Sequence, residues 1–459
     1  MIPDPRVRLL NQAVPPIHAE YVLYWAQANR RIDFNPALDF AVRLANQSKL
    51  PLLVYEALTC SHEWANDRFH TFILEGVPEN ARRAERIRAG YVFYHRARMS
   101  DPDDVLYVLA NKALAVVTDD FPAYLPSIFN PRAASRIEVP YYVVDASCIV
   151  PMALIGKQQY AAYALRPKIR KALPEFLVPP LPVKLARPWT GATPSFHTVV
   201  TAEKIPNMVA ASDIDHTVLP CKAFRGGRKE ALKRLKKFLD HNLIRYARLN
   251  REPSAKATSQ LSPYLHFGHV SSLEVALAVR ESAEEHQLIA DEFLEQLIVR
   301  RELAFNFARF GPAPEKLSAL PDWVQATLKK HAADPRDPIY ARERFDRAAT
   351  HDELWNACQR ELLRDGIIHG YYRMYWGKKI VEWSRTPQEA LDTMIYLNDR
   401  YALDGRDPNT YTNILWCLGL HDRPWGERRI FGMVRYMSLD GMKRKTDVEA
   451  YLRTNSPVL

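Results

Sequence analysis

The sequence lacks any long apolar run. No stretch of its 459 residues approaches the roughly 20 consecutive apolar residues that a membrane-spanning helix needs. The first residues, MIPDPRVRLLNQAVPPIHAEY, contain no basic segment followed by an apolar core, so they do not look like a signal peptide. These two absences argue against a membrane-spanning or secreted protein and predict a cytoplasmic one.

Cysteine is also scarce. The five cysteines lie far apart and form no CxxC pair; they are Cys60, Cys148, Cys221, Cys358 and Cys417. Zinc fingers and iron–sulfur clusters need closer spacing, and a disulfide framework needs an oxidising compartment. We therefore expect reduced cysteines that serve mainly as small packing residues, and no metal site.

Two common nucleotide-binding motifs are missing. No GxGxxG follows the first apolar run, and no GxxxxGK[ST] occurs anywhere in the chain. A dinucleotide site of the dehydrogenase kind and a P-loop are therefore unsupported.

Positive charge, by contrast, is in excess. The formal net charge is +10 and the isoelectric point is about 9.2. Because counterion release favours contacts between basic residues and phosphates, a surplus of this size favours polyanionic partners such as DNA.

The first 180 residues alternate short apolar runs with helical patterns. The runs occupy residues 21–25, 50–58, 91–95, 113–118 and 141–146, and an amphipathic helix is expected over 35–49. Continuous apolar strands separated by helices are typical of a parallel sheet covered on both faces. We predict a Rossmann-like α/β domain over residues 1–177.

The remaining chain has a different pattern. Residues 178–222 are rich in proline and aperiodic, as expected of a linker. From Gly226 onward apolar residues recur at helical spacing, for example over 229–246, and similar patterns return at 288–307, 322–331, 350–363 and 370–383. We predict an all-α domain over residues 223–459.

Three tryptophans stand at suggestive positions. Trp376 and Trp383 are seven residues apart, so two helical turns place them on one helix face, and Trp355 belongs to the preceding predicted helix. The simpler interpretation is that all three are core residues. The alternative is a chain of oxidisable indoles that relays an electron from the surface to a buried flavin, and spacing alone does not decide between the two.

Six segments, in order, resemble class II photolyases, which repair cyclobutane pyrimidine dimers. They are TSQLSPYLHFGHVS (258–271), FLEQLIVRRELAFNF (293–307), THDELWNACQREL (350–362), HGYYRMYWGKKIVEW (369–383), LNDRYALDGRDPNTY (397–411) and HDRPWGERRIFGMVRYMS (421–438). YWAQANRRIDFNPAL (24–38) is a weaker match. The resemblance covers nearly the whole chain and implies an N-terminal antenna-type domain followed by a helical FAD-binding domain.

The resemblance implies a binding site for FAD, folded into a U. The phosphate contacts would come from Tyr246, Thr258, Ser259, Gln260, Leu261 and Ser262. Hydroxyls and free backbone N–H groups at a helix start suit phosphates, although TSQLS also reads as an ordinary helix cap. Arg373 and Asp404 would form an ion pair against the isoalloxazine ring, and Asn398 would lie beside flavin N5.

The resemblance also implies the reaction. Reduced FAD would absorb light and pass an electron to a dimer that has been flipped out of the DNA duplex. Trp376 would be the indole nearest the flavin, with Trp355 next and Trp383 outermost. The dimer would meet an aromatic and basic surface made by Trp416, Trp425, Met374, Tyr371, Arg423, Arg435 and Arg251. We expect a monomer that acts on ultraviolet-damaged DNA.

Two positions depart from the family pattern. The family has a second glutamate where this chain has Gln296, and an arginine where it has Asn250, with Arg251 one residue on. An amide donates and accepts hydrogen bonds but supplies neither a proton nor a charge. Some members of the family carry a light-harvesting antenna such as a deazaflavin in the first domain; YWAQANRR differs from the family pattern there, so the sequence leaves the occupancy of that site open.

Three other functions stay open. A cryptochrome-like photoreceptor would keep the flavin and tryptophans without repair, and the two departures favour it. A basic DNA-binding module without catalysis would leave the six segments unexplained. A photolyase for the (6-4) lesion would need a histidine pair that we do not find in the sequence.

Overall fold

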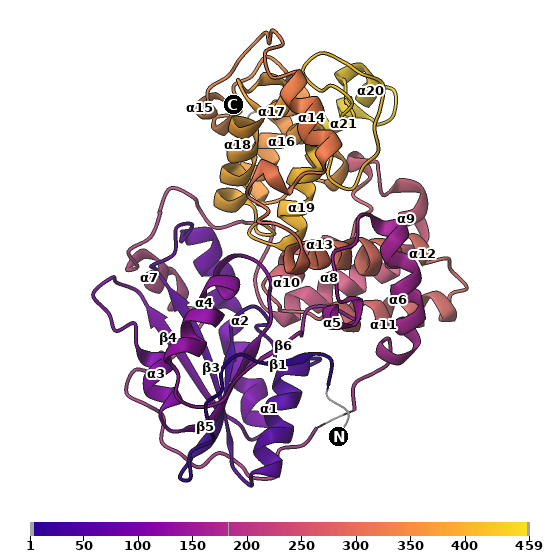
Figure 1. Cartoon of the computed structure of the whole chain (residues 1–459). Helices are drawn as coiled ribbons and strands as arrows, with labels where there is room; N and C mark the ends of the chain where they lie inside the picture. The colour runs from indigo at the N-terminus through magenta and orange to yellow at the C-terminus, as the bar shows by residue number, and fades with distance from the viewer. Residues whose placement is uncertain (1–3, 182, 457–459) are drawn as a thin grey trace.

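The computed structural model describes residues 4–181 and 183–456. Its first half contains a six-stranded sheet with the strand order β1-β6-β5-β2-β3-β4 (Figure 1). The strands are β1 (Val7–Leu9), β2 (Tyr21–Ala26), β3 (Leu52–Thr59), β4 (Gly90–Arg96), β5 (Ala113–Asp119) and β6 (Tyr141–Val144). β2 to β6 pair in parallel, and β1 pairs antiparallel with β6 at the edge.

Helices cover both faces of the sheet. They are α1 (Pro36–Gln47), α2 (Asp67–Arg86), α3 (Val105–Ala110) and α4 (Tyr124–Arg136). One apolar core joins α1 to alternate residues of the strands, such as Tyr24 and Val54; the other joins α3 and α4 to the intervening residues, such as Leu23 and Leu53. The predicted parallel α/β sheet is confirmed, because strands buried on both faces need continuous apolar runs.

The second half of the chain is helical, as predicted. Its α-helices are α8 (Arg228–His241), α9 (Leu243–Leu249), α10 (Ser262–His266), α11 (Ser272–Glu285), α12 (Asp291–Leu294), α13 (Arg301–Phe310), α14 (Asp322–Lys330), α15 (Arg342–Asp346), α16 (Glu353–Asp365), α17 (Gly370–Trp383), α18 (Pro387–Tyr401), α19 (Pro408–Cys417), α20 (Leu439–Lys443) and α21 (Val448–Thr454). Short 3-10 turns, η1 (Pro253–Ala255) and η3 (Leu317–Ala319), lie between them. Over the described residues, no helix combines the length and apolar composition that crossing a membrane requires.

Two predicted helices are interrupted. The pattern over 229–246 divides at Asn242 into α8 and α9. The pattern over 288–307 contains α12, then a π-helical segment, η2 (Glu295–Arg300), and then α13. A π-helix has a different residue period from an α-helix, so it changes which side chains share a face.

Two helices from the first half of the chain lie among the helices of the second. α5 (Met152–Ile155) packs against α13, and α6 (Ala162–Phe176) packs against η2, so both lie with the helical half rather than on the sheet (Figure 1). Leu165 and Ile169 of α6 belong to the same apolar core as Leu235 of α8. The predicted linker holds one helix, α7 (Ile205–Ala210). The domain limits at residues 177 and 222 stay a prediction.

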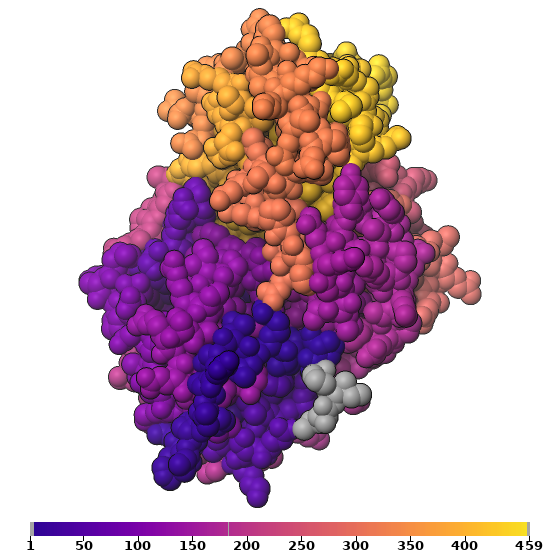
Figure 2. Space-filling model, in the orientation of Figure 1, coloured from indigo at the N-terminus to yellow at the C-terminus, as the bar shows by residue number. Residues whose placement is uncertain are grey.

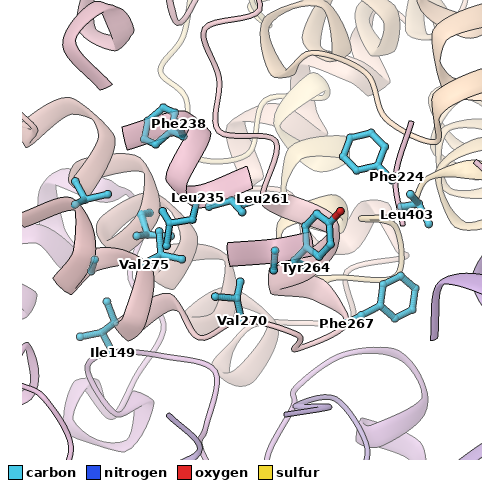
Figure 3. Close-up of a cluster of buried hydrophobic side chains, with 14 of the residues drawn as sticks. Ile149, Phe224, Leu235, Phe238, Leu261, Tyr264, Phe267, Val270, Val275 and Leu403 are labelled. Carbon is cyan, nitrogen blue, oxygen red and sulfur yellow. The ribbon is translucent and has the colours of Figure 1, made fainter. Parts of the chain in front are cut away.

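The two halves share an apolar core. Figure 3 shows part of it, where Ile149 of the first half lies near Val275 of the second and belongs to the same cluster as Leu235. In Figure 2 the orange stretch after α13 reaches down across the front to the indigo part of the first half. Such a continuous interface holds the helical half in a fixed position against the sheet.

Buried ionisable side chains also join the halves. The Arg68 guanidinium on α2 donates to the carbonyl oxygens of Leu219, Leu362, Leu363 and Tyr401 at 2.5 to 3.1 Å. Glu302 on α13 accepts the peptide N–H groups of Ile149 and Val150 at 2.6 and 3.3 Å. Burial raises the pKa of Glu302 to about 8.

Glu302 should make stability depend on pH. Its pKa is raised in the folded protein and normal in the unfolded chain, so the folded state binds the extra proton between pH of about 4.5 and 8. Stability from this carboxyl is therefore lost as pH rises through that window, by roughly 2–4 kcal/mol. Glu302→Gln, which stays neutral, should melt at a higher temperature than the original chain at pH of about 8, and the two should converge near pH 5.

The exposed Glu315→Gln is the control, since Glu315 lies in the segment that follows α13. Thermal melting across this pH range decides the matter. An identical pH dependence in the Glu302→Gln variant and the original chain would show that Glu302 is already ionised when folded.

Candidate functional site

Two adjoining cavities lie in the helical half. The larger has a volume of about 840 Å3 and the smaller about 320 Å3. Residues that line both are Tyr246, Thr258, Gln296, His369, Gly370, Arg373 and Asn413. Together the two cavities have room for a large cofactor and part of a substrate.

The TSQLS segment forms one wall of the smaller cavity, which all five of its residues line. Gln260 has a positive φ of 55°, and Arg234 Nη1 donates to its Oε1 at 2.9 Å. Leu261 is buried in the shared apolar core (Figure 3), and α10 begins at the next residue. The anchored leucine thus fixes a row of hydroxyl and amide groups at the edge of the cavity.

Arg373 and Asp404 form the predicted ion pair. Arg373, on α17, donates from Nη2 to both carboxylate oxygens of Asp404 at 2.8 and 3.2 Å. Both residues line the smaller cavity. The remaining Nε of Arg373 is buried and has no hydrogen-bond partner among residues 4–181 and 183–456.

Two further polar groups face the cavities without partners. Asn398, on α18, donates from Nδ2 to the Met394 carbonyl at 2.8 Å, which leaves its buried Oδ1 free among the described residues. His369 caps α17 through Nδ1, while its Nε2 has no partner in the described part of the chain. Burial lowers the pKa of His369 to about 4, so the ring is neutral. Buried polar atoms rarely stay unpaired, so these groups are suited to a polar ligand.

The three predicted tryptophans form a contiguous chain. Trp376 lines the larger cavity. Its ring centroid lies 6.1 Å from that of Trp355, with the planes 6° apart, and Trp355 lies 6.3 Å from Trp383. Trp376 Nε1 donates to Gln359 at 3.0 Å, and Trp355 Nε1 donates to the Trp376 carbonyl at 3.0 Å. This geometry fits both interpretations made from the sequence. All three indoles are buried, as core residues are, and they lie in series, as an electron relay requires.

Trp383 does not itself reach the surface, because its exposed fraction is 3%. Beyond it lie Tyr340, at 5.8 Å between ring centroids, and His351, at 4.9 Å. Tyr340 Oη is 2.8 Å from His351 Nδ1. Both of these residues are more exposed than Trp383, so the aromatic series continues outward through them.

The π-helix η2 separates two neighbouring polar side chains. Glu295 forms an ion pair with Arg166 of α6 at 2.6 Å, whereas Gln296 lines both cavities. π-helical segments often occur at functional sites because they change the direction of one side chain. Here the change leaves the amide of Gln296 exposed in the cavity and the carboxylate of Glu295 in the packing between helices.

The predicted substrate residues surround the opening of the larger cavity. Those that line it are Tyr371, Met374, Trp416, Arg435 and Arg251. Trp425 lies on the adjoining loop with an exposed fraction of 40%, and Arg423 and Arg435 stack on its ring at 5.1 and 5.2 Å. The loop therefore combines an aromatic face with two cations next to the cavity.

Ion pairs hold that loop in place. His331 lies 2.7 Å from Asp334 and 2.9 Å from Glu427, and Lys330 Nζ lies 2.6 Å from Glu427. Asp334 also accepts the peptide N–H of Ile430 at 2.7 Å. The two carboxylates raise the pKa of His331, which favours the charged imidazolium that the loop uses.

Sequence reasoning missed several residues that line the larger cavity. They include His369, Arg300, Glu292 and Lys378. Arg300 stacks on Trp416 at 5.7 Å, and Glu292 accepts a hydrogen bond from Asn250 at 2.8 Å. Asn250 therefore has a partner of its own, while Arg251 beside it lines the cavity. The basic residues and the histidine lay within the matched segments, but only their position in the fold distinguishes them from neighbours.

The whole chain is similar to known photo-lyases. It is 39% identical to the deoxyribodipyrimidine photo-lyase of Methanothermobacter thermautotrophicus, over 98% of each chain. It is 37% identical to that of Potorous tridactylus, over 98% of this chain and 84% of the relative. The chain belongs to the deoxyribodipyrimidine photo-lyase family. No protein-family model matches the sequence.

Solved structures agree with the photo-lyase fold. A class III photolyase from Agrobacterium tumefaciens superposes with a TM-score of 0.67 over 96% of this chain and 87% of its own, at 18% identity. A cryptochrome from Synechocystis gives 0.71 over 97% and 89%, at 17% identity. This chain thus shares its fold with one photolyase and one cryptochrome, while its sequence relatives make it an enzyme of the photo-lyase family.

The photo-lyase chain has another cavity at the carboxyl ends of β2 and β3. Open parallel sheets bind ligands at the carboxyl ends of their strands, at the point where the strand order reverses. Here that point is β2, which has β3 on one side and β5 on the other. The volume of the cavity is about 170 Å3, and aromatic residues such as Trp25, Phe121 and Tyr124 line it together with His62 and others. Burial, together with the nearby cations Arg406 and Arg30 that also line the cavity, lowers the pKa of His62 to about 3, so the imidazole is neutral.

Proposed function

We propose that this photo-lyase splits cyclobutane pyrimidine dimers in DNA by light-driven electron transfer, and that it is of class II. The proposal is carried by one observation. Two adjoining cavities meet at Arg373: its ion-pair partner Asp404 lines the smaller one, and Asn398, Trp376 at the end of an indole chain and Trp416 line the larger one.

FAD suits the walls of the two cavities. The TSQLS hydroxyls and Tyr246 would hold its phosphates, Arg373 and Asp404 would lie against its ring system, and Asn398 Oδ1 would accept a hydrogen bond from N5–H. When bound in reduced form, FAD supplies an electron on absorbing light. The unpaired Arg373 Nε, Asn398 Oδ1 and His369 Nε2 support this, because a polar ligand would satisfy them.

The protein's own residues would do the positioning. Trp416 and Trp425 would stack on the flipped bases, and the mouth of the cavity would exclude water around them. Gln296 would donate and accept hydrogen bonds at the edge of the dimer. Arg423 and Arg435 would hold the DNA backbone, where cations fix register without reading sequence. Trp376, Trp355 and Trp383 would carry electrons inward under light.

The test is light-dependent repair. Purified, chemically reduced protein is mixed with a duplex that contains one thymine dimer and exposed to blue light, and the ultraviolet absorbance of restored thymines is followed. We expect recovery in light, none in darkness and no change with undamaged duplex. Flavin-loaded, reduced protein that restores nothing would overturn the proposal.

A cryptochrome-like photoreceptor is the second candidate. It is favoured by Gln296, which places an amide where the class II pattern has a carboxylate. Such a protein would still take electrons through the indole chain, so it would photoreduce its flavin yet fail the repair assay. The two results together separate the candidates.

We also propose the cavity at β2 and β3 for an antenna such as a deazaflavin. Its aromatic lining and its place at the switch point of the sheet support the proposal. Its volume of about 170 Å3 is below the roughly 300 Å3 at which ligand pockets usually begin, so an antenna would require the cavity to widen on binding.

A further inference from the structure

Lys378 is a buried cation that has no hydrogen-bond partner among the residues the structure describes. It lies on α17 with an exposed fraction of 1%, and its Nζ makes no hydrogen bond within residues 4–181 and 183–456. It nevertheless lines the larger cavity, one helical turn after Met374. An unpaired ammonium in the interior is strongly unfavourable, and replacing such a group by an apolar side chain is often neutral or stabilising.

The next residue gives the contrast. Lys379 Nζ donates to Glu382 at 2.6 Å and to Tyr436 at 3.3 Å, so its charge is paired within the protein. Burial lowers the pKa of Lys378 to about 8, and no carboxylate comes within salt-bridge distance of it in the described structure. Lys378 is thus placed to pair with an anion that enters the cavity.

The surroundings indicate which anion. The charged groups that act on Lys378 are Asp422 and Arg435, both on the substrate side, together with the thiol of Cys417. Lys378 does not line the smaller cavity, which all five TSQLS residues line, whereas only Thr258 of that segment also reaches the larger one; the pyrophosphate of FAD would therefore lie on the side of the smaller cavity. The pyrimidines of a flipped dinucleotide are neutral, and its phosphodiesters are its only charged groups.

We propose that Lys378, together with Arg435, forms a phosphodiester-binding subsite inside the cavity, which takes a backbone phosphate of the flipped dinucleotide. This inference rests on the proposed function. It differs from ordinary backbone contact because the cation lies inside the pocket and meets phosphate only after the dinucleotide has left the duplex. The subsite therefore favours flipped-out DNA over stacked DNA.

The test compares Lys378→Met with the original chain. Binding of a dimer-containing duplex should weaken about 10-fold, and the slope of log affinity against log salt should fall by about one. Binding of undamaged duplex should not change. The flavin spectrum should be retained and the melting temperature should be equal or higher, since an unpaired buried charge has been removed.

A neutral linkage identifies the phosphate. Duplexes are made with one methylphosphonate either within the dimer or on one flanking side. At the contacted position the neutral linkage should weaken binding to the original chain but not to Lys378→Met. Lys112→Met is the charge-matched control, since Lys112 is exposed in the first half and pairs with Glu20; it should behave like the original chain.

Three results would overturn the subsite. Lys378→Met could bind dimer duplex as tightly as the original chain, or every linkage could act equally on both. In the third result, inorganic phosphate stabilises the original chain but not the variant, and no methylphosphonate linkage changes DNA binding. The site would then bind a free anion rather than a DNA phosphate. If Lys378→Met does not fold, Lys378→Arg should keep the linkage effect, and its loss would count against the proposal. An original chain that does not prefer dimer duplex would instead contradict the proposed function itself.

Discussion

Replacing Trp376 by phenylalanine should abolish photoreduction of bound flavin while leaving repair by chemically reduced enzyme intact. Trp376 is the indole that lines the cavity, and it stacks on Trp355 at 6.1 Å. Phenylalanine fills a similar space but is not readily oxidised, so the chain would end before it reaches the cavity. Repair needs only reduced flavin and bound dimer, so it should survive.

The measurement has two parts. The visible flavin absorbance is followed under blue light with a reductant in solution, and repair is then assayed after reduction with dithionite. Trp376→Phe also removes the hydrogen bond to the buried Gln359, which should lower stability by about 1–3 kcal/mol, so melting and flavin content are recorded alongside. Photoreduction that persists in the variant would show that electrons enter by another route.

Trp189→Phe is the matched control. Trp189 packs against Tyr21 of the sheet domain, far along the chain from the indole series, at 5.5 Å between ring centroids. Its loss should leave photoreduction unchanged. Trp355→Phe should behave like Trp376→Phe, because Trp355 is the link between Trp376 and Trp383.

The sheet could be predicted because its strands are buried on both faces. The runs at 50–58 and 113–118, for example, are apolar at most positions. β1 could not be found this way, since three residues at an edge, paired antiparallel and half exposed, leave no periodic signal. The location of α6 against the helical half was equally hidden, because an amphipathic helix does not encode which partner its apolar face meets.

Local deviations in the helical half were not predictable either. The apolar pattern over 288–307 looks continuous, yet η2 interrupts it and directs Glu295 and Gln296 to different surroundings. Most of the predicted site residues line the two cavities, whereas Trp355, Trp383, Arg423 and Trp425 lie outside their linings. Nothing in the sequence distinguishes Lys378 from other lysines. Its burial and its lack of a hydrogen-bond partner among the described residues become visible only in the fold.

Gln296 is the departure with the clearest expected consequence for repair. Its amide is exposed in the cavity of the free protein, and a bound dimer would enclose it. Gln296→Ala should then leave the polar edge of the dimer unpaired in a dry site, which costs about 1–3 kcal/mol and lowers repair about 5- to 150-fold. Flavin content and photoreduction should be unchanged, because the TSQLS wall and the indole chain are untouched.

Gln296→Glu distinguishes a tolerated amide from a damaging one. If hydrogen bonding alone is needed, both side chains serve, and repair near neutral pH should stay within about 10-fold of the original chain. Of the two side chains only glutamate titrates. Repair by Gln296→Glu should therefore gain a pH dependence that repair by the original chain lacks. A large gain on Gln296→Glu would mean that the missing carboxyl limits repair here, and equal repair by Gln296→Ala would remove Gln296 from substrate binding altogether.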